Sequence, residues 1–305
     1  MLSGVNSCVL VYDVGGSHIS AAVCHAGDYR LGPVVKASHS ERQTSEAFVD
    51  VLVSLAEQAT ASTGGVQGAS VAMPGPFDYA AGVSWMKHKL PYLYGVDLRQ
   101  ALAARFGWQP GQVRFLNDAA AYLLGEVGAG AARGATRAVG ITLGTGIGSA
   151  FAVNGRVVAE GAGVPPGGEI WNVPYQGGIV EDQLSSKAIR QIDEQRTGQQ
   201  REVAAIAAAA ATDTVASEVF AEFGRRLGRA MKSLFTDFGP DVIVVGGGIA
   251  RSAHLFLPFA QEQMKGSAVA LRVSALGDSA PLVGAGVAWF ADSITAEGTP
   301  AAEAQ

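Results

Sequence analysis

The chain of 305 residues carries 40 glycines and a net charge of −5, and only 16% of its side chains are charged. Glycine is therefore present at roughly twice its average frequency of about 7%, and charged residues lie below their average of about 25%. An apolar content of 48% excludes a disordered chain. The mild acidity argues against a face that neutralises the phosphates of DNA or RNA. At about 150 residues per domain, the length predicts two domains, each with its own core.

Nothing in the sequence predicts a membrane span or a disulfide framework. No apolar run reaches the roughly 18 residues that a span needs. Residues 1–16 read as a first strand and not as a secretory signal, because they lack a basic start. Cys8 and Cys24 are too few for a disulfide framework or a cysteine-rich zinc site, and both lie in strand-like segments. We therefore expect reduced thiols in a cytoplasmic protein that binds no membrane.

The first half of the chain alternates strands with helices. Apolar, β-branched runs predict strands over 8–14, 18–24, 68–77 and 113–118. Helical spacing of apolar residues predicts helices over 44–63, 97–106 and 119–130. Thr44 or Ser45 is the expected cap of the first helix, and Asp97 stands near the start of the second.

The second half repeats this arrangement. Residues 137–158 read as a strand, a glycine loop and a strand, and 240–252 as a strand that runs into a glycine turn. Helices are expected over 182–197, 203–211, 214–238 and 280–292. We therefore expect an α/β protein with a small domain of residues 1–118 plus 280–292, a large domain of 119–279 and a disordered tail of 293–305.

Four glycine clusters follow predicted strands, at 15–16, 144–148, 167–168 and 246–248. Glycine lets a backbone approach a ligand closely, and successive N–H groups in such turns form a concavity that binds anions. A glycine pair after a strand is most often only a tight turn. Four of them, two carrying the hydroxyls of Ser17 and Thr145, favour polyphosphate binding, although neither the P-loop pattern nor a dinucleotide fingerprint is present.

Acidic residues stand beside two of the predicted strand ends. Asp13 directly precedes the first glycine turn, where its carboxylate suits Mg²⁺ or simply shapes the turn. Asn117 and Asp118 end a strand and precede a helix. Asp118 is placed either to cap that helix or to act as a general base that accepts the proton of an attacking hydroxyl.

Five motifs together resemble those of the ROK family of sugar kinases and repressors. In chain order they are DVGGS, NDAAAYLLGE, GITLGTGIGSAFAVNGRVV, GGE and PDVIVVGGG. The resemblance runs from about residue 9 to 290. It implies two actin-like (ribonuclease H-like) domains with mixed sheets that face each other across a cleft, as in the sugar kinase/actin-like ATPase superfamily.

The resemblance also implies a role for each motif. The phosphate loops would be formed by Asp13, Gly15, Gly16 and Ser17 and by Gly144, Thr145 and Gly146, with Gly246, Gly247 and Gly248 on the adenosine side. The sugar would meet Gly75, Asn117, Asp118, Glu169 and Glu181. His88 lies in a segment that matches a sugar-contacting stretch, where it either reaches the sugar or the phosphates or belongs to an exposed basic loop.

The sequence departs from the family pattern where the family usually has a zinc motif. Asn172 stands in place of the histidine ligand, and no cysteine lies nearby. Because tetrahedral zinc needs four such ligands, we predict no structural zinc and a loop held by the packing of Trp171, Val173 and Tyr175. The lost histidine usually also contacts the sugar, so the identity of the hexose stays open.

Together with these residues, the resemblance implies ATP-dependent phosphorylation of a hexose hydroxyl, most simply the 6-position of glucose or a close relative. Asp118 would be the general base, Asp13 would hold Mg²⁺ directly or through water, and family members are commonly homodimers. One alternative is a sugar-responsive regulator of the same family, although the twelve residues before Asp13 are too few for a DNA-binding domain and the net charge is −5. The others are a sensor without turnover, a kinase for another sugar, and a kinase that uses polyphosphate.

Overall fold

The computed structural model describes residues 8–38 and 44–291, so the predicted tail of 293–305 lies outside the described residues. The chain divides into two compact units. The first unit contains the described residues up to Asp118 and those from Ala285 onwards, and the second runs from Ala119 to Gly284.

The first unit is built on a five-stranded mixed sheet in the order β3-β2-β1-β4-β7. Its strands are β1 (Cys8–Val14), β2 (His18–His25), β3 (Val35–Ser38), β4 (Ala69–Met73) and β7 (Val113–Asn117). β1, β2 and β3 form an antiparallel meander, whereas β4 and β7 continue the sheet parallel to β1. A small hairpin of β5 (Phe77–Asp78) and β6 (Val83–Ser84) follows β4.

The second unit repeats this topology with a sheet in the order β10-β9-β8-β13-β14. Its strands are β8 (Arg137–Leu143), β9 (Ile147–Val153), β10 (Arg156–Val158), β13 (Val242–Gly246) and β14 (Ala270–Val273). The first three strands are again antiparallel, and β13 and β14 run parallel to β8. The predicted strand, glycine loop and strand at the start of each half are therefore confirmed as hairpins β1–β2 and β8–β9.

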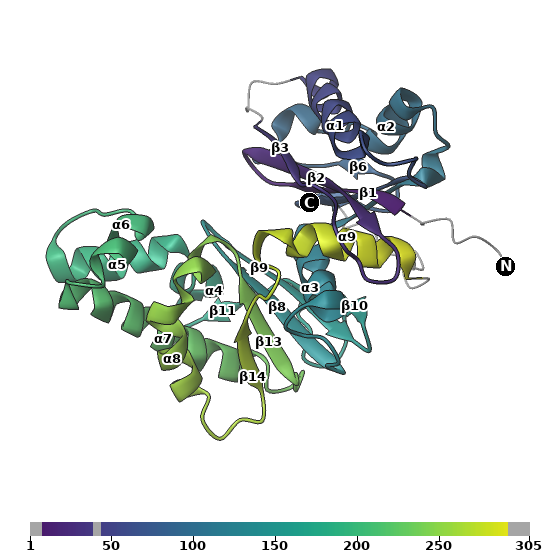
Figure 1. Ribbon diagram of the computed structural model, residues 1–305. Helices are drawn as coiled ribbons and strands as arrows, with labels where there is room; N and C mark the ends of the chain where they lie inside the picture. The colour runs from purple at the N-terminus through teal and green to yellow at the C-terminus, as the bar shows by residue number, and fades with distance from the viewer. Residues whose placement is uncertain (1–7, 39–43, 292–305) are drawn as a thin grey trace. The chain divides into compact units, whose positions relative to one another are not determined.

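Helices connect the strands and cover the sheets (Figure 1). The first unit contains α1 (Ser45–Thr60) and α2 (Leu98–Phe106), and α3 (Asp118–Ala129) follows β7. The second contains α4 (Val180–Gln183), α5 (Ser186–Thr197), α6 (Val203–Ala209), α7 (Thr214–Leu234) and α8 (Ala253–Gln263), and α9 (Ala280–Phe290) follows β14. The side chains of Thr44 and Asp97 accept hydrogen bonds from N–H groups in the first turns of α1 and α2, as expected of N-caps.

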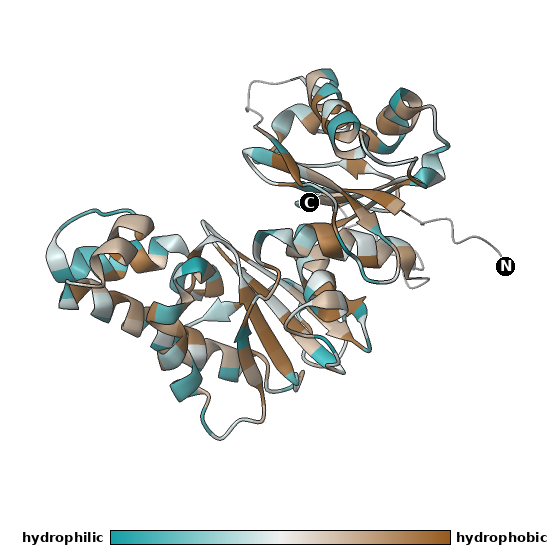
Figure 2. Cartoon of the chain, in the orientation of Figure 1, coloured by the Kyte–Doolittle hydropathy of each residue, from teal (hydrophilic) through white to brown (hydrophobic). Residues whose placement is uncertain are grey.

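The alternation of side chains along the central strands gives each sheet two apolar faces. In β1, Leu10 and Tyr12 belong to the core that α1 and α2 complete, whereas Val11 lies towards Gly286 of α9. In β13, Ile243 belongs to the core with α5, α7 and α8, whereas Val244 packs with residues of α3. Figure 2 shows these central strands as hydrophobic on both units.

Two helices differ from the sequence-based expectation. The helix expected over 182–197 is broken at Leu184 and Ser185, where the extended backbone of Ser185 separates α4 from α5. The helix expected over 214–238 ends at Leu234. Phe235 and Phe238 leave it to pack edge-on against Phe151, with ring centroids 5.5 and 5.0 Å apart. Burial of these two rings therefore outweighs continuation of the helix.

An ion network around one buried carboxylate fixes the start of α7. Arg201 binds the fully buried carboxylate of Asp193 through two nitrogens, at 2.5 and 2.9 Å, and also contacts Asp213 at 3.4 Å. Asp213 caps α7. Hydrogen bonds from the backbone N–H groups of Ala216 and Val215, together with the guanidinium of Arg201, lower the pKa of its carboxyl group.

Within the described ranges, no single helix is long and apolar enough to cross a membrane. Among the helices that the structure describes, the pair α6 and α7, bent by 119° at their break, passes the test of length and composition when taken together.

Helices α3 and α9 cross with their backbones in contact. A Cβ on Gly284 would overlap the carbonyl oxygen of Ala121, and one on Gly125 would overlap that of Ala280. Backbone atoms cannot move aside as a flexible side chain can. The two glycines therefore allow α3, whose first residue is Asp118, to lie directly on α9.

Substitution of Gly284 by Ala is expected to destabilise the protein by about 1–3 kcal/mol or more, because the new methyl group must push the two helices apart. Thermal unfolding would measure the loss. Gly64→Ala is the matched control, since a Cβ at Gly64 would meet nothing within 4 Å. Equal melting temperatures for Gly284→Ala and the wild type would contradict the close crossing.

Candidate functional site

The predicted sugar-side and catalytic residues of the first unit lie at the carboxyl ends of its parallel strands. Asp13 of β1 is paired with Ala72 of β4, and Met73 at the end of β4 is paired with Asn117 of β7. Asn117 is the last residue of β7 and Asp118 the first of α3, and both are half-buried. In open α/β sheets, the carboxyl ends of the strands are where ligands bind. The sheet therefore brings Asp13, Asn117 and Asp118 to one edge.

The turn that joins β1 to β2 is open towards solvent. Gly15 donates its N–H to the carbonyl of His18 at 2.9 Å, which closes the turn. Gly16 and Ser17 are exposed, and a Cβ on Gly16 would meet nothing within 4 Å. The half-buried carboxylate of Asp13 at the base of this turn suits Mg²⁺, because magnesium is commonly held by one or two carboxylates together with substrate phosphates and waters.

Gly75 and His88 lie in segments that follow β4 along the chain. Gly75 is half-buried directly after β4, and the nearest atom to a Cβ there would be the hydroxyl of Tyr79 at 3.6 Å. The hydroxyl of Tyr79 also receives a hydrogen bond from Nδ2 of Asn117 at 3.1 Å. Gly75 and Asn117 thus meet at Tyr79. His88 is exposed in the loop between β6 and the short helix Pro91–Leu93.

The two glycine turns of the second unit lie side by side. Gly246 at the end of β13 is paired with Thr142 near the end of β8. Gly247 has φ +82°, and a Cβ there would overlap the backbone of Leu143, directly before Gly144. In the β8–β9 turn, Gly144 donates to the carbonyl of Gly146 at 2.9 Å and Thr145 is exposed. The carboxyl ends of β8 and β13 therefore present two adjoining glycine turns.

Glu181 holds the β8–β9 turn in place. Its Oε2 accepts the backbone N–H of Ile147 at 3.1 Å, and a Cβ on Gly146 would meet the same carboxylate oxygen. The N–H of Ser186, at the start of α5, donates to the carbonyl of Gly144 at 2.8 Å. The structure thus places Glu181 against the predicted phosphate turn, a contact that the motif alone did not indicate.

Glu169 is exposed, and the backbone groups of the residues on either side of it are hydrogen-bonded to one buried serine. The hydroxyl of Ser149 donates to the carbonyl of Gly168 at 2.7 Å and accepts the N–H of Ile170 at 3.0 Å. Glu169 itself accepts a hydrogen bond from Nε1 of Trp171 at 2.9 Å. Ser149 therefore determines where the backbone of Glu169 lies.

A two-stranded hairpin occupies the stretch where the family usually has its zinc motif. It consists of β11 (Pro174–Tyr175) and β12 (Gly178–Ile179). Val173 and Tyr175 pack against the core of the second unit, as predicted. The prediction for Trp171 is wrong: its side chain is 41% exposed, because its indole N–H is bonded to the exposed carboxylate of Glu169.

Two residues that the sequence did not single out lie beneath the glycine turn after β13. The ring of Tyr122 fills the space where a Cβ of Gly246 would be, and its burial strongly raises the pKa of its hydroxyl. Glu126, one turn further along α3, is fully buried. Its only sequence signal is a carboxylate inside an otherwise apolar helix.

The carboxylate of Glu126 accepts four hydrogen bonds. The donors are the N–H groups of Ala131 at 2.7 Å and of Ala275 and Leu276 at 3.1 Å each, and the hydroxyl of Ser274. Ser274 in turn donates its N–H to the carbonyl of Val245 at 2.9 Å. Glu126 therefore fastens α3 to the loop beside the β13 turn.

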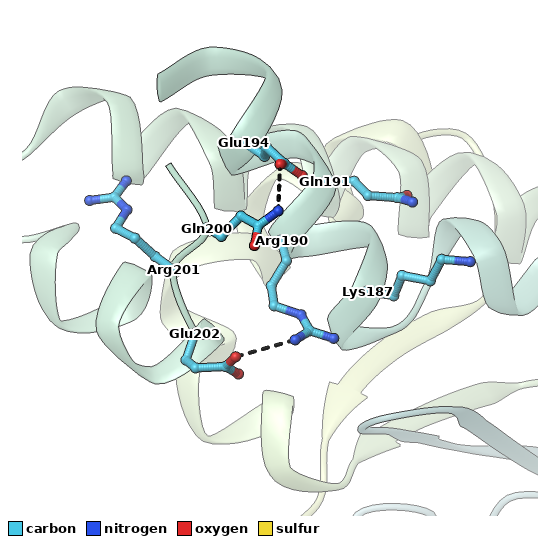
Figure 3. Close-up of a pocket in the computed structure, with 7 residues that line it drawn as sticks. All are labelled: Lys187, Arg190, Gln191, Glu194, Gln200, Arg201 and Glu202. Carbon is cyan, nitrogen blue, oxygen red and sulfur yellow. Dashed lines mark hydrogen bonds and ion pairs between the residues drawn. The ribbon is translucent and has the colours of Figure 1, made fainter. Parts of the chain in front are cut away.

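A polar pocket of about 330 Å³ lies elsewhere in the second unit (Figure 3). It is lined by Lys187, Arg190, Gln191 and Glu194 of α5 and by Gln200, Arg201 and Glu202. Two interactions link residues that line it: Arg190 forms an ion pair with Glu202 at 3.2 Å, and Nε2 of Gln200 donates a hydrogen bond to Glu194 at 2.9 Å. None of the predicted site residues lines it.

The chain belongs to the ROK family, whose sequence pattern it matches over residues 9–292. The glucokinase of Thermotoga maritima is 27% identical over 80% of this chain and 82% of its own length. The ROK hexokinase of Thermus thermophilus is also 27% identical, with a TM-score of 0.75 over 92% of this chain and 97% of its own. The ROK glucokinase of Streptomyces griseus, solved with glucose and AMPPNP, has a TM-score of 0.74 at 24% identity and spans 92% of this chain and 98% of its own.

These similarities confirm the family that the five motifs indicated. The solved structures share the α/β architecture with mixed sheets, so the predicted fold class is also confirmed. The roles of individual residues stay predictions.

Glu126→Gln is expected to lower the free energy of unfolding by about 1–3 kcal/mol, because the new amide NH₂ must face backbone N–H donors that now have an acceptor. Thermal unfolding would measure the change. Glu262→Gln is the control, since Glu262 forms an exposed ion pair with Lys265, whose loss is expected to cost about 0.5 kcal/mol or less. A Glu126→Gln variant as stable as this control would contradict the four-donor arrangement.

Proposed function

We propose that this chain transfers the γ-phosphoryl group of ATP to a hydroxyl of a hexose, the 6-position of glucose or a close relative. The relatives of the chain bear out the class of enzyme, a sugar kinase. The observation that carries the finer proposal is the position of Asn117 and Asp118 at the carboxyl end of β7, on the same edge of the sheet as Asp13 and its open glycine turn.

In this proposal Asn117, Gly75 and Glu169 bind the sugar, and the carboxylate of Asp118 accepts the proton of the attacking hydroxyl. The oxygen of that hydroxyl attacks the γ-phosphorus, and the bond from phosphorus to the β-phosphate oxygen breaks, so that ADP leaves. Asp118 is half-buried at the first position of α3, so the helix fixes the position of the backbone from which its carboxylate extends. A general base is worth about 10²–10⁴-fold in rate.

The glycine turns are proposed to bind the nucleotide. The N–H groups of the turn at Gly15, Gly16 and Ser17 and of the turn at 144–146 would stabilise negative charge on the phosphates, and the turn at 246–248 would meet the adenosine. Asp13 would hold Mg²⁺, and bound magnesium supplies positive charge that offsets the charge of the transferring phosphoryl group. Backbone donors would allow a chain with few Lys and Arg residues to bind a polyanion.

Glu181 is proposed to affect sugar binding through the β8–β9 turn, whose position it supports. Its carboxylate already accepts the N–H of Ile147, so any contact with the sugar would join the sugar site to the position of the turn at 144–146. His88, exposed in its loop, is proposed as a peripheral contact. Mg²⁺ dependence, a homodimeric assembly and a cytoplasmic location stay predictions.

Asp118→Asn is expected to lower kcat by about 10²–10⁴-fold and to leave the KM for the sugar nearly unchanged, because an amide keeps the shape of the side chain but cannot accept the proton. Steady-state kinetics with coupled ADP detection would measure both. Asp97→Asn is the matched control, since it also changes an aspartate at a helix start, where Asn caps equally well. Near-wild-type turnover by Asp118→Asn would overturn its role as the base.

The substrate is tested by a screen of glucose, mannose, fructose, N-acetylglucosamine, N-acetylmannosamine and allose, each with ATP and with polyphosphate. The proposal predicts turnover of a hexose with ATP, with glucose or a close relative giving the highest kcat/KM. A higher kcat/KM with polyphosphate than with ATP would identify polyphosphate as the phosphoryl donor. No turnover with any combination of sugar and donor would contradict the proposal that the protein is a kinase. Sequence-specific DNA binding in a gel-shift assay, together with absent turnover, would favour the regulator instead.

A further inference from the structure

Trp171 is exposed although the backbone that carries it is anchored. Its side chain is 41% exposed and lies in a turn that the N–H of Val173 closes by donating to the carbonyl of Ile170 at 3.1 Å. Ile170 is fully buried and donates its own N–H to the hydroxyl of Ser149 at 3.0 Å. The carbonyl of Trp171 accepts the N–H of Glu181 at 3.1 Å. The turn therefore holds a large aromatic ring at the surface in a defined place.

The indole N–H of Trp171 orients the carboxylate of Glu169. Nε1 donates to Oε2 of Glu169 at 2.9 Å, and both side chains are exposed. Because this hydrogen bond engages Oε2, the carboxylate still offers Oε1 as an acceptor. A glutamate that is already held in place loses less side-chain freedom when a ligand binds. Trp171 thus contacts both predicted sugar-side glutamates, Glu169 through its side chain and Glu181 through its backbone.

An aromatic face beside a carboxylate matches the two kinds of surface that a pyranose ring presents. Hydroxyl groups around the edge of the sugar ring donate hydrogen bonds, and a carboxylate oxygen accepts them. The C–H groups on the faces of the sugar ring are slightly positive, and the face of an aromatic ring carries partial negative charge. Glu169 offers the acceptor, and the exposed indole of Trp171 offers the aromatic face.

We propose that Trp171 is a sugar-binding residue whose indole face stacks on the pyranose ring while its N–H holds Glu169 for a sugar hydroxyl. The inference rests on the proposed function, in which Glu169 binds the sugar. It explains why the anchored turn exposes Trp171 and does not bury it in the nearby core, as it does Ile170.

Two variants of Trp171 separate the aromatic face from the N–H. Trp171→Phe keeps a face and removes the N–H, whereas Trp171→Ala removes both. The KM for glucose, or for the sugar of the screen with the highest kcat/KM, is expected to rise about 3- to 10-fold in Trp171→Phe and about 10- to 100-fold in Trp171→Ala. Because these contacts exist before and during phosphoryl transfer, kcat is expected to stay within about 3-fold of the wild type. Equal KM values for the two variants would contradict stacking.

A double-mutant cycle tests whether the N–H acts through Glu169. If it does, Trp171→Phe changes the KM for the sugar by less than about 2-fold when Glu169→Ala is already present. The same rise in both backgrounds would contradict the orienting role of the N–H.

Tryptophan fluorescence tests the contact without turnover. A titration with glucose is expected to change the fluorescence of the wild type, because a stacked sugar displaces water from an exposed indole. Most of this change is expected to be lost in Trp171→Phe at saturating glucose. A change as large as that of the wild type would contradict contact between the sugar and Trp171.

Trp289→Phe is the matched control, because it also removes an indole N–H that donates to a side-chain oxygen, Oε1 of Gln67 at 3.3 Å. It is expected to keep the KM for the sugar and the fluorescence change of the wild type, and equal losses in both Trp→Phe variants would contradict a specific role for Trp171. A wild type that phosphorylates the sugar while Trp171→Ala keeps its KM would overturn this inference alone. A wild type that neither binds nor phosphorylates any hexose of the screen would overturn the proposed function as well.

Discussion

Parallel pairing of strands is the constraint on which both halves of this molecule depend. A strand that runs parallel to β1 or β8 ends at the same edge of the sheet as that strand does, so the segments that leave β4, β7 and β13 emerge beside the hairpin turns. By register Asp13 is paired with Ala72, the residue before Met73, and Met73 is paired with Asn117, as Thr142 is with Gly246. The strand topology of each unit therefore brings its candidate site residues together, independently of contacts between their side chains.

Buried and half-buried polar groups then hold these loops in position. Ser149 binds the backbone on both sides of Glu169, Glu181 binds the β8–β9 turn, and Glu126 binds the loop after β14. Tyr79 performs the same task in the first unit, between Met73 and Asn117. Glycine turns alone permit many backbone conformations, and each of these hydrogen bonds selects one of them, so that little ordering is left to the moment of ligand binding.

Local signals in the sequence predicted much of the fold and the ends of its strands. The apolar run before Asp13 and the caps Thr44 and Asp97 each act within a few residues, so pattern and propensity suffice. The short strand β14 and the contact of Glu126 with Leu276 depend on chain segments far apart in sequence, about 150 residues in the case of Glu126, and no local pattern encodes them. Trp171 failed as a core residue because a neighbouring carboxylate offered its indole N–H a partner at the surface.

The claim that ligands bind at the carboxyl ends of the strands is tested most directly by backbone hydrogen exchange, measured by mass spectrometry. A non-hydrolysable ATP analogue is predicted to slow exchange at 15–17, 144–146 and 246–248, and glucose to slow it around 75 and 117. Saturating ligands that leave these turns unchanged, or that protect only the pocket residues of 187–202, would contradict the account.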